Sequence, residues 1–393
     1  MPMLVHFGAG NIGRSLVAPL FRAAGYEVLC IDTADEVVAA LNARDSYRVV
    51  IKDTLPVGVP NVIEVTGVRA LHGSDTTAVA AAVANADLCS TAVGPAALPS
   101  VARSLAAGIV RRTAPLNVIL CENVRHGATL MRRSLQTYLD ASALAQVGLV
   151  ETSIGKMVPI MPADVRARDP LEVWAEAYNE IIADADGFIG RPPEVPGLVL
   201  KHHFAAYVDR KLFVHNLGHA ATAYFGFLAG ARYIWEAIEV PHVRARVEEA
   251  MKVSARALHA QYHYELAWEE LQNYLDDLLR RFANRALGDT VFRVGRDLPR
   301  KLAPDDRCVG AVRLVCAHGG DPAPLCAVIA AALHFAARDE NGQLFPPDHA
   351  FHADFRAHGL VRTLQSVAGL DPARDAHLLT LIETFYHALR NPQ

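Results

Sequence analysis

The N-terminal stretch up to Asp32 constrains the fold most strongly. A short apolar run, residues 4–7, leads into Gly8-Ala-Gly-Asn-Ile-Gly13, and a segment with helical apolar spacing follows. A second apolar run, residues 27–32, then ends in the acid Asp32. This order of strand, G-x-G-x-x-G, helix, strand and acid predicts a β-α-β unit that binds a dinucleotide.

Each glycine of this loop has a physical role under that interpretation. Gly8 permits the tight turn, Gly10 lets the backbone approach a pyrophosphate, and Gly13 lets helix and strand pack closely. The helix N-terminus offers free N–H groups to the phosphates. Asp32 accepts hydrogen bonds from the ribose hydroxyls and would repel a 2′-phosphate, so NAD is favoured over NADP as the cofactor. A purely structural glycine-rich turn is the alternative.

Three further residues fall inside the same loop and its helix. Asn11, Ile12 and Arg14 are candidates for contact with the phosphates or the nicotinamide of the cofactor. For Arg14, a solvated position on the helix is an equally good interpretation.

Strand and helix patterns continue to alternate after this unit. We expect strands at residues 47–50, 62–68, 87–93, 116–121 and 147–152, and helices at residues 34–42, 76–86, 98–107 and 128–139. The alternation predicts an α/β fold with a Rossmann-type, doubly wound parallel sheet, which binds ligands beyond the carboxyl ends of its strands. Val93, Gly94 and Asn123 fall at such ends. Asn123 is expected near the nicotinamide, and its alternative role is that of a turn-former.

The composition changes near residues 184–197, which are rich in proline and glycine. The later patterning is mostly helical, at residues 204–229, 232–238, 241–262, 267–281, 321–337, 360–367 and 374–390. We therefore expect two domains. Residues 1–190 would form the dinucleotide-binding domain, and residues 191–393 a mostly α-helical C-terminal domain for substrate and catalysis.

The first long helix of the second half carries a polar group, Lys211, Asn216 and His219. At about 100° per residue, His219 and Asn216 lie about 80° and about 140° from Lys211, within one helix face. A base, an amide donor and a titratable ring suit chemistry at a hydroxyl or a carbonyl. A solvated polar face is the alternative. His215 falls on the same side and either lines the site or packs in the core.

A basic stretch follows later, with four cations in nine residues: Arg293, Arg296, Arg300 and Lys301. Forked guanidinium groups suit recognition of a phosphate or a carboxylate. The alternative is a solvated loop whose partners are the nearby aspartates.

Bulk properties exclude several classes of protein. The net charge of −4, without a basic polyanion patch, indicates no nucleic-acid partner. The six cysteines lack C-x-x-C pairs, so we expect a reducing, cytoplasmic setting, no disulfide framework and no zinc site. No signal peptide is apparent, and no apolar run reaches the ~18 residues of a membrane span. Without a long exposed apolar helix, we expect a monomer.

Several motifs together carry a resemblance to one family. They are His6-Phe-Gly-Ala-Gly-Asn-Ile-Gly-Arg14, Thr91-Ala-Val-Gly-Pro95, Cys121-Glu-Asn123, Asp169-Pro-Leu-Glu-Val173, Arg210-Lys-Leu-Phe213 with Asn216 and Gly218-His219, and Val294-Gly-Arg296 with Arg300-Lys-Leu302. With them the chain resembles the polyol-specific long-chain dehydrogenases, from the first strand to about residue 335. The Lys-x4-Asn-x2-His pattern is much more specific to this family than the glycine loop.

The resemblance implies roles for individual residues. Lys211 would be the general base, Asn216 and Asn123 would donate hydrogen bonds to the developing alkoxide, and His219 would position substrate hydroxyls. No metal is implied. The most similar branch is the one that interconverts D-mannitol 1-phosphate and D-fructose 6-phosphate with NAD. In that branch the phosphate would be bound by cations, here Arg293, Arg296, Arg300, Lys301 and Lys156.

The sequence departs from this branch at two places. Gly155-Lys156 stands where the phosphate-specific relatives carry an Asp-Arg pair, and His215 stands where a small or apolar residue is usual. Two other functions therefore stay open. One is the same chemistry on an unphosphorylated polyol or a sugar acid, and the other is a non-catalytic NAD(H)-binding sensor.

Overall fold

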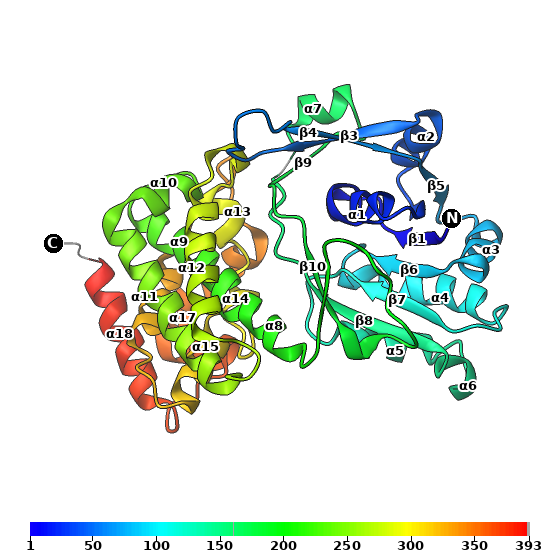
Figure 1. The fold of residues 1–393 in the computed structure, drawn as a ribbon. Helices are drawn as coiled ribbons and strands as arrows, with labels where there is room; N and C mark the ends of the chain where they lie inside the picture. The colour runs from blue at the N-terminus through cyan, green and yellow to red at the C-terminus, as the bar shows by residue number, and fades with distance from the viewer. Residues whose placement is uncertain (160, 391–393) are drawn as a thin grey trace. The chain divides into compact units, whose positions relative to one another are not determined.

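The computed structural model describes residues 1–159 and 161–390 and divides the chain into two compact units (Figure 1). Met1–Phe204 form the first, which we call the sheet unit, and Ala205–Gln393 form the second, the helical unit. The division falls after the Pro/Gly-rich stretch. The last strand of the sheet unit, Leu198–Lys201, follows that stretch and pairs with Ile181–Asp184.

In the described part of the sheet unit, eight strands form one sheet in the order β11 (Leu198–Lys201), β10 (Ile181–Asp184), β8 (Val147–Ser153), β7 (Leu116–Leu120), β6 (Leu88–Thr91), β1 (Met3–Phe7), β2 (Glu27–Asp32) and β5 (Val68–His72). The paired strands run parallel except for β10 against β8. The order reverses at β1, which lies between β2 and β6, as in a doubly wound sheet. The predicted α/β fold is confirmed.

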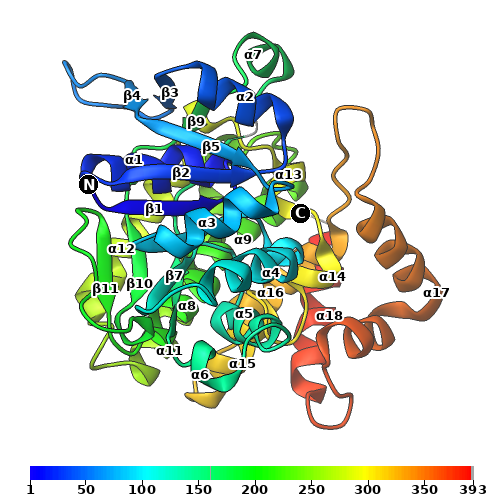
Figure 2. The same cartoon turned by 90° about the vertical axis from the view of Figure 1, so that its right-hand side faces the viewer.

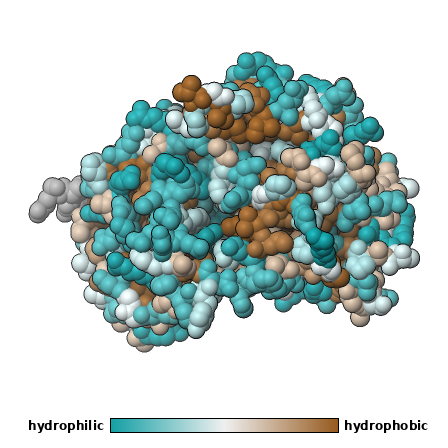
Figure 3. All heavy atoms as spheres, in the orientation of Figure 1, coloured by the Kyte–Doolittle hydropathy of each residue, from teal (hydrophilic) through white to brown (hydrophobic). Residues whose placement is uncertain are grey.

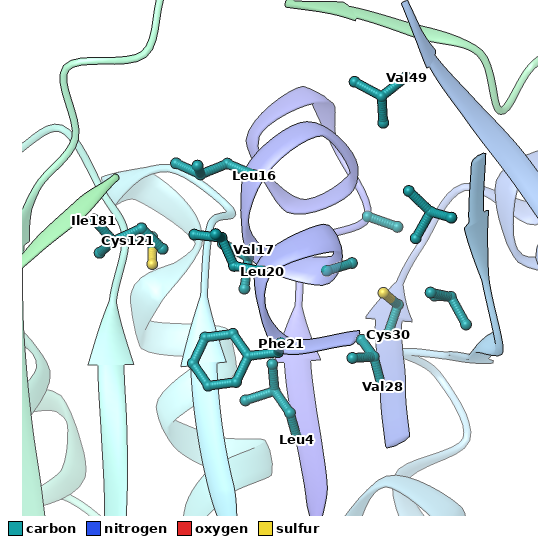
Figure 4. Packing of buried hydrophobic residues seen from close by; sticks show 14 of the residues in the cluster. Leu4, Leu16, Val17, Leu20, Phe21, Val28, Cys30, Val49, Cys121 and Ile181 are labelled. Carbon is teal, nitrogen blue, oxygen red and sulfur yellow. The ribbon is translucent and has the colours of Figure 1, made fainter. Parts of the chain in front are cut away.

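Helices cover both faces of this sheet because successive strand residues point to opposite faces. The π-helical turn η1 (Gly13–Val17) and α1 (Ala18–Ala23) pack over Leu4 of β1, as Figure 4 shows for Leu16, Val17, Leu20 and Phe21. On the opposite face, Val5 belongs to a second core with α3 (Thr76–Asn85), α4 (Leu98–Ile109) and α5 (Gly127–Leu135) (Figure 2). The unit therefore has two apolar cores, one on each side of the sheet.

A small second sheet lies beside these layers, in the order β4 (Val62–Thr66), β3 (Ser46–Ile51) and β9 (Val173–Ala175). The sequence also allows a hairpin of residues 47–50 and 62–68, and the antiparallel pairing of β3 with β4 confirms it, whereas one continuous strand over residues 62–68 is wrong. Gly67, with φ +68°, ends β4 and turns the chain into β5 of the main sheet. Apolar side chains are exposed on the β3–β4 hairpin, namely Val57, Val59, Val62 and Ile63, where hydrophobic residues gather at the surface in Figure 3. Helices α2 (Asp35–Ala43), α6 (Ala141–Leu144) and α7 (Ala163–Arg168) complete the unit, with short 3-10 turns at Pro95–Ala97 and Ala185–Gly187.

The helical unit consists of α8 (Ala205–Arg210), the π-helical turn η4 (Lys211–Asn216), α9 (Leu217–Leu228), α10 (Ile234–Glu239), α11 (Pro241–Gln261), α12 (Trp268–Phe282), a 3-10 turn (Arg285–Leu287), α13 (Val291–Gly295), α14 (Leu298–Lys301), α15 (Val309–Ala317), α16 (Ala323–His334), α17 (Pro346–Ala368) and α18 (Ala376–Arg390). Helix α9 is buried along most of its length because small and apolar residues occupy nearly every position. The sequence patterns missed α13, α14 and α15. The basic stretch, for which a solvated loop was the alternative, lies on α13 and α14 and between them. Within residues 1–159 and 161–390, no helix has the length and apolar character that crossing a membrane requires.

Candidate active site

The glycine turn connects β1 to η1 and is tight at two of its glycines. Gly8 has φ +103°, and a Cβ there would lie 2.5 Å from the carbonyl oxygen of Ala92. A Cβ on Gly13 would lie 2.2 Å from the carbonyl oxygen of Gly8 and 2.6 Å from Nε2 of the buried His6. Only glycine fits at these two positions without moving the backbone.

Gly10 differs from its neighbours because nothing in the protein requires a glycine there. A Cβ on Gly10 would meet no described heavy atom within 4 Å, and its φ lies outside the left-handed region. A purely structural turn gives no reason for glycine at an unobstructed position. Close approach of a pyrophosphate does give one, so the turn fits a dinucleotide better than the structural alternative.

Asp32 lies at the carboxyl end of β2, beside this turn. Its Oδ2 accepts a hydrogen bond from the backbone N–H of Ala9 at 2.6 Å. Its Oδ1 accepts hydrogen bonds from the backbone N–H groups of Thr33 and Ala34 at 2.7 and 2.9 Å. These bonds hold the carboxylate at the strand end, where an acid is expected to bind the ribose hydroxyls.

The other loop residues differ in exposure. Asn11 is exposed, whereas Ile12 is half-buried and packs against the core beneath α1. Arg14 is buried, and its guanidinium donates a hydrogen bond to the carbonyl of Pro170 at 2.6 Å. The interpretation of Arg14 as a solvated helix residue is therefore wrong, because its side chain is buried within the sheet unit.

Glu122 organises the strand ends at β6 and β7. It accepts hydrogen bonds from Oγ1 of Thr91 at 2.7 Å and from the backbone N–H of Val93 at 3.1 Å. Burial raises the pKa of the Glu122 carboxyl, and these two hydrogen bonds oppose the rise. Glu122 thereby fixes the backbone between the end of β6 at Thr91 and Gly94, which has φ +84°. Asn123 follows Glu122 directly and is exposed.

In the helical unit, Lys211 and Asn216 are the first and last residues of the π-helical turn η4. A π-helix hydrogen-bonds residue i with residue i+5, and its wider turn brings two residues five apart closer to one face than an α-helix does. The expectation of a regular α-helix, with Asn216 about 140° from Lys211, is therefore wrong in its geometry. The wider turn aligns the lysine with the amide more closely than the sequence pattern predicted.

Lys211 has the electrostatic character of a base. Burial, assisted by the positive charge of Arg307, lowers the pKa of the Lys211 ammonium to about 8. Arg307 is buried and is held by Asp306, whose Oδ1 accepts a hydrogen bond from its Nε at 2.8 Å. Arg307 was not predicted from the sequence, because its large separation from Lys211 along the chain gives no signal that the two side chains interact.

The two histidines of this segment share an aromatic neighbour, Phe282 at the end of α12. The His219 ring stacks on Phe282 with centroids 5.0 Å apart and planes 7° apart, and the His215 centroid lies 5.9 Å away. Burial, together with surrounding cations, lowers the pKa of both imidazoles well below the usual value. Both rings are therefore neutral at neutral pH. His215 is buried within the helical unit.

His219 also faces a carboxylate that the sequence analysis missed. Its Nε2 lies 3.7 Å from Oδ2 of Asp289, which is buried and pairs with Arg293. Burial raises the pKa of Asp289, and Arg293 opposes the rise. Because the imidazole is neutral, the contact between His219 and Asp289 is not an ion pair.

The cations proposed for phosphate binding have partners in the protein. Arg293 pairs with Asp289, and Arg300 with Asp297 and, at 3.7 Å, Asp306. Arg296 lies over the rings of Phe292 and Phe345. Lys301 is buried and donates to the carbonyls of Val294 and Arg296, and burial and neighbouring arginines lower its pKa to about 7.

Lys156, the fifth proposed cation, belongs to the sheet unit. It is buried, and its Nζ donates hydrogen bonds to the carbonyl of Tyr178 at 2.7 Å and to Oδ1 of Asn179 at 3.4 Å. Its ammonium group therefore donates hydrogen bonds to neutral oxygen atoms of the sheet unit. Among the residues that the structure describes, no three His, Cys, Asp or Glu side chains gather as ligands for a metal ion.

Fold and residues together define a class of protein, with a Rossmann-type domain followed by a helical domain that carries a lysine of lowered pKa. Residues 2–197 match the family model of the mannitol dehydrogenase Rossmann domain. Residues 203–389 match the model of the mannitol dehydrogenase C-terminal domain. The chain therefore belongs to the mannitol dehydrogenase family.

Two solved structures have a similar fold. One is mannitol 2-dehydrogenase of Pseudomonas fluorescens in a ternary complex with NAD and D-mannitol, with a TM-score of 0.75, 18% identity, and coverage of 99% of this chain and 92% of that one. The other is a D-sorbitol dehydrogenase in substrate-free form, with a TM-score of 0.80, 19% identity, and coverage of 99% and 93%. At such identities the similarity establishes the fold.

Proposed function

We propose that this chain is an NAD-dependent, metal-independent oxidoreductase that interconverts D-mannitol 1-phosphate and D-fructose 6-phosphate. The observation that carries the proposal is Lys211, with a pKa lowered to about 8, on the same π-helical turn as Asn216. Membership of the mannitol dehydrogenase family supports the chemistry at a polyol carbon.

The cofactor is NAD. The open space at Gly10 accepts the pyrophosphate, Asp32 accepts hydrogen bonds from the adenosine ribose, and Val93 and Gly94 lie at the strand end towards the nicotinamide. Bound NAD⁺ supplies the hydride acceptor for the carbon that carries the reacting hydroxyl.

Lys211 acts as the general base in oxidation. The neutral amine takes the proton of the substrate hydroxyl, which becomes a carbonyl oxygen as the hydride leaves its carbon. With a pKa of about 8, about one Lys211 amine in ten is neutral at pH 7, whereas an ordinary lysine amine is neutral in fewer than about one in a thousand molecules. In the reduction direction the ammonium returns the proton to the alkoxide.

Asn216 and Asn123 donate hydrogen bonds to the same oxygen while it carries negative charge. Loss of one such donor commonly costs about 10²–10³-fold in rate. His219, neutral because of its lowered pKa, positions substrate hydroxyls away from the reacting carbon.

A phosphate group on the substrate requires positive charge at the site. A cation near the proposed base supports an anionic substrate, because Arg307 lowers the pKa of both Lys211 and His219. A second candidate is the same reaction on an unphosphorylated polyol. The contacts of the other proposed cations favour it. Arg293 pairs with Asp289, and Lys301 and Lys156 donate hydrogen bonds to carbonyl oxygens of the protein, so fewer of their N–H groups remain for a phosphate.

The experiment is to follow NADH absorbance with purified protein, comparing D-fructose 6-phosphate with D-fructose under identical conditions. Turnover restricted to the phosphorylated sugar supports the main proposal, and turnover restricted to free fructose supports the second candidate. If NADH binds and neither sugar reacts, both proposals fail and the chain would fit a non-catalytic NAD(H)-binding sensor.

A further inference from the structure

Two buried polar atoms face each other in the helical unit without a hydrogen bond. Nε2 of His219 and Oδ2 of Asp289 lie 3.7 Å apart, beyond the 2.7–3.2 Å of an N–H···O bond. Neither atom has a hydrogen-bond partner among the described residues. Unpaired buried polar atoms cost stability, so a site with two of them calls for a ligand group that pairs with both.

Each of the two side chains has another contact in the helical unit, which keeps Nε2 of His219 and Oδ2 of Asp289 from moving together. The His219 ring stacks against Phe282, with planes 7° apart. The other carboxylate oxygen of Asp289 pairs with Arg293. The main-chain carbonyl of Asp289 accepts a hydrogen bond from the N–H of Ile234 at 2.9 Å, which fixes the backbone on the remaining side.

The separation fits a hydroxyl group. An oxygen about 2.8 Å from each of two atoms can bridge a gap of this width, and a hydroxyl has one donor and two acceptor positions. A phosphate is unsuitable, because Asp289 accepts hydrogen bonds and repels an anion. Arg293 does not offset this, because its charge is already compensated by the same carboxylate.

We propose that His219 and Asp289 form a hydroxyl clamp, in which one hydroxyl of the sugar substrate donates to Oδ2 of Asp289 and accepts from Nε2–H of His219. This inference rests on the proposed function and adds a specificity-determining residue, Asp289, that reads the polyhydroxyl chain and excludes an anionic group at that point.

The first test replaces Asp289 with asparagine, which keeps the shape and removes the charge. In D289N the KM for D-fructose 6-phosphate should rise roughly 10–100-fold, the range for one hydrogen bond to a charged group. The kcat should change by less than about threefold and NADH affinity should be unchanged, because the clamp would bind a hydroxyl other than the reacting one, equally in the ground state and the transition state. If the wild type reduces D-fructose and not D-fructose 6-phosphate, the same measurements are made with D-fructose. Both sugars carry the same hydroxyls at C3, C4 and C5.

The second test compares monodeoxy analogues of the same sugar, lacking the hydroxyl at C3, C4 or C5. For one analogue, the KM with the wild type should exceed that of the parent sugar, whereas with D289N the two KM values should be equal. The analogue lacks the hydroxyl and D289N lacks the carboxylate of the same interaction, so removing both costs no more than removing one. A variant that discriminates all three analogues as the wild type does would overturn the clamp and leave Asp289 a structural partner of Arg293.

Glu239→Gln serves as the matched control, because Glu239 forms an exposed carboxylate–arginine pair with Arg285 in the same unit. It should behave as the wild type in every assay.

If D289N does not fold, as judged by circular dichroism, His219→Gln tests the other side of the clamp, with the same loss of discrimination expected for the same analogue. A wild type inert towards both sugars would overturn the proposed function and the clamp together, whereas normal wild-type turnover with unaltered variants would overturn the clamp alone.

Discussion

At the residue scale, the proposed mechanism depends most on Lys211, because a general base must be deprotonated near neutral pH. Lys211→Ala should lower turnover on the order of 10²–10⁴-fold, the usual contribution of a general base. NADH affinity should not change, because the glycine turn belongs to the sheet unit. Steady-state rates and a fluorescence titration with NADH measure the two effects.

Lys252→Ala is the control for this variant, because Lys252 lies on the surface of α11 and pairs with Glu248. Its activity should equal that of the wild type. Near-normal turnover in Lys211→Ala would remove the lysine from the proposed mechanism.

The pH dependence of oxidation follows from the same side chain. The neutral amine is the active form, so kcat/KM should rise with pH and level off above the Lys211 pKa of about 8. Arg307→Gln removes a positive charge that favours deprotonation, so the Lys211 pKa should rise and the inflection should move to higher pH. Rates between pH 6 and 10 test this, and an inflection unmoved by the substitution would separate Arg307 from the base.

Sequence spacing identified Lys211, Asn216 and His219 as neighbours because they lie within a few residues of one another. It missed Arg307 and Asp289, which lie in segments between helices and are distant from Lys211 in the sequence. Their contribution depends on tertiary packing. The sequence alone does not show which side chains a charged residue far along the chain will contact. The short spacing of Asp289 and Arg293, four residues apart, was the one available hint of their pairing.

At the element scale, the glycine turn contains two kinds of glycine. Gly8 and Gly13 are required by the fold, whereas we expect Gly10 to be required by a ligand. Gly13→Ala would place a Cβ 2.2 Å from the Gly8 carbonyl oxygen and should destabilise the protein by roughly 1–3 kcal/mol. Gly10→Ala meets open space, so its stability should stay within about 0.5 kcal/mol while NADH affinity falls at least about tenfold. Thermal denaturation and NADH titration distinguish them, and unchanged NADH affinity in Gly10→Ala would contradict the pyrophosphate contact.

The alternation of strands and helices was predictable from sequence because each element has its own apolar period. The π-helical turns at Gly13–Val17 and Lys211–Asn216 were not, because one extra residue in a turn leaves no mark on a pattern read at an α-helical period. The helices α13 and α14 escaped for a related reason. Each is too short to complete an apolar repeat, and Asp297, with φ +73°, separates them.

At the scale of the whole molecule, the change from alternating to purely helical patterning was visible in the sequence. The Pro/Gly-rich stretch drew attention to residues 184–197, whereas the compact units divide at Phe204. The four-residue strand β11 accounts for the difference, because it follows the link and still pairs with β10. A strand of that length is too short for its period to be recognised in a sequence.

The division into two units makes a prediction about how the cofactor stabilises the chain. Asp32 and the glycine turn belong to the sheet unit, so NADH should stabilise the folded state of that unit. At a free concentration about 100 times its Kd, a ligand that binds only the folded state adds about 2.7 kcal/mol to the free energy of unfolding. If thermal unfolding has two transitions, only the one belonging to the sheet unit should move.

NADPH at the same concentration is the matched control ligand, since its 2′-phosphate would meet the carboxylate of Asp32. It should shift the transition far less than NADH does, and Asp32→Ala should narrow the difference between the two cofactors by removing that repulsion. Differential scanning calorimetry of the full chain measures both. Equal stabilisation of the wild type by NADPH would show that Asp32 does not select the cofactor, and no stabilisation by either would mean that the glycine turn is structural after all.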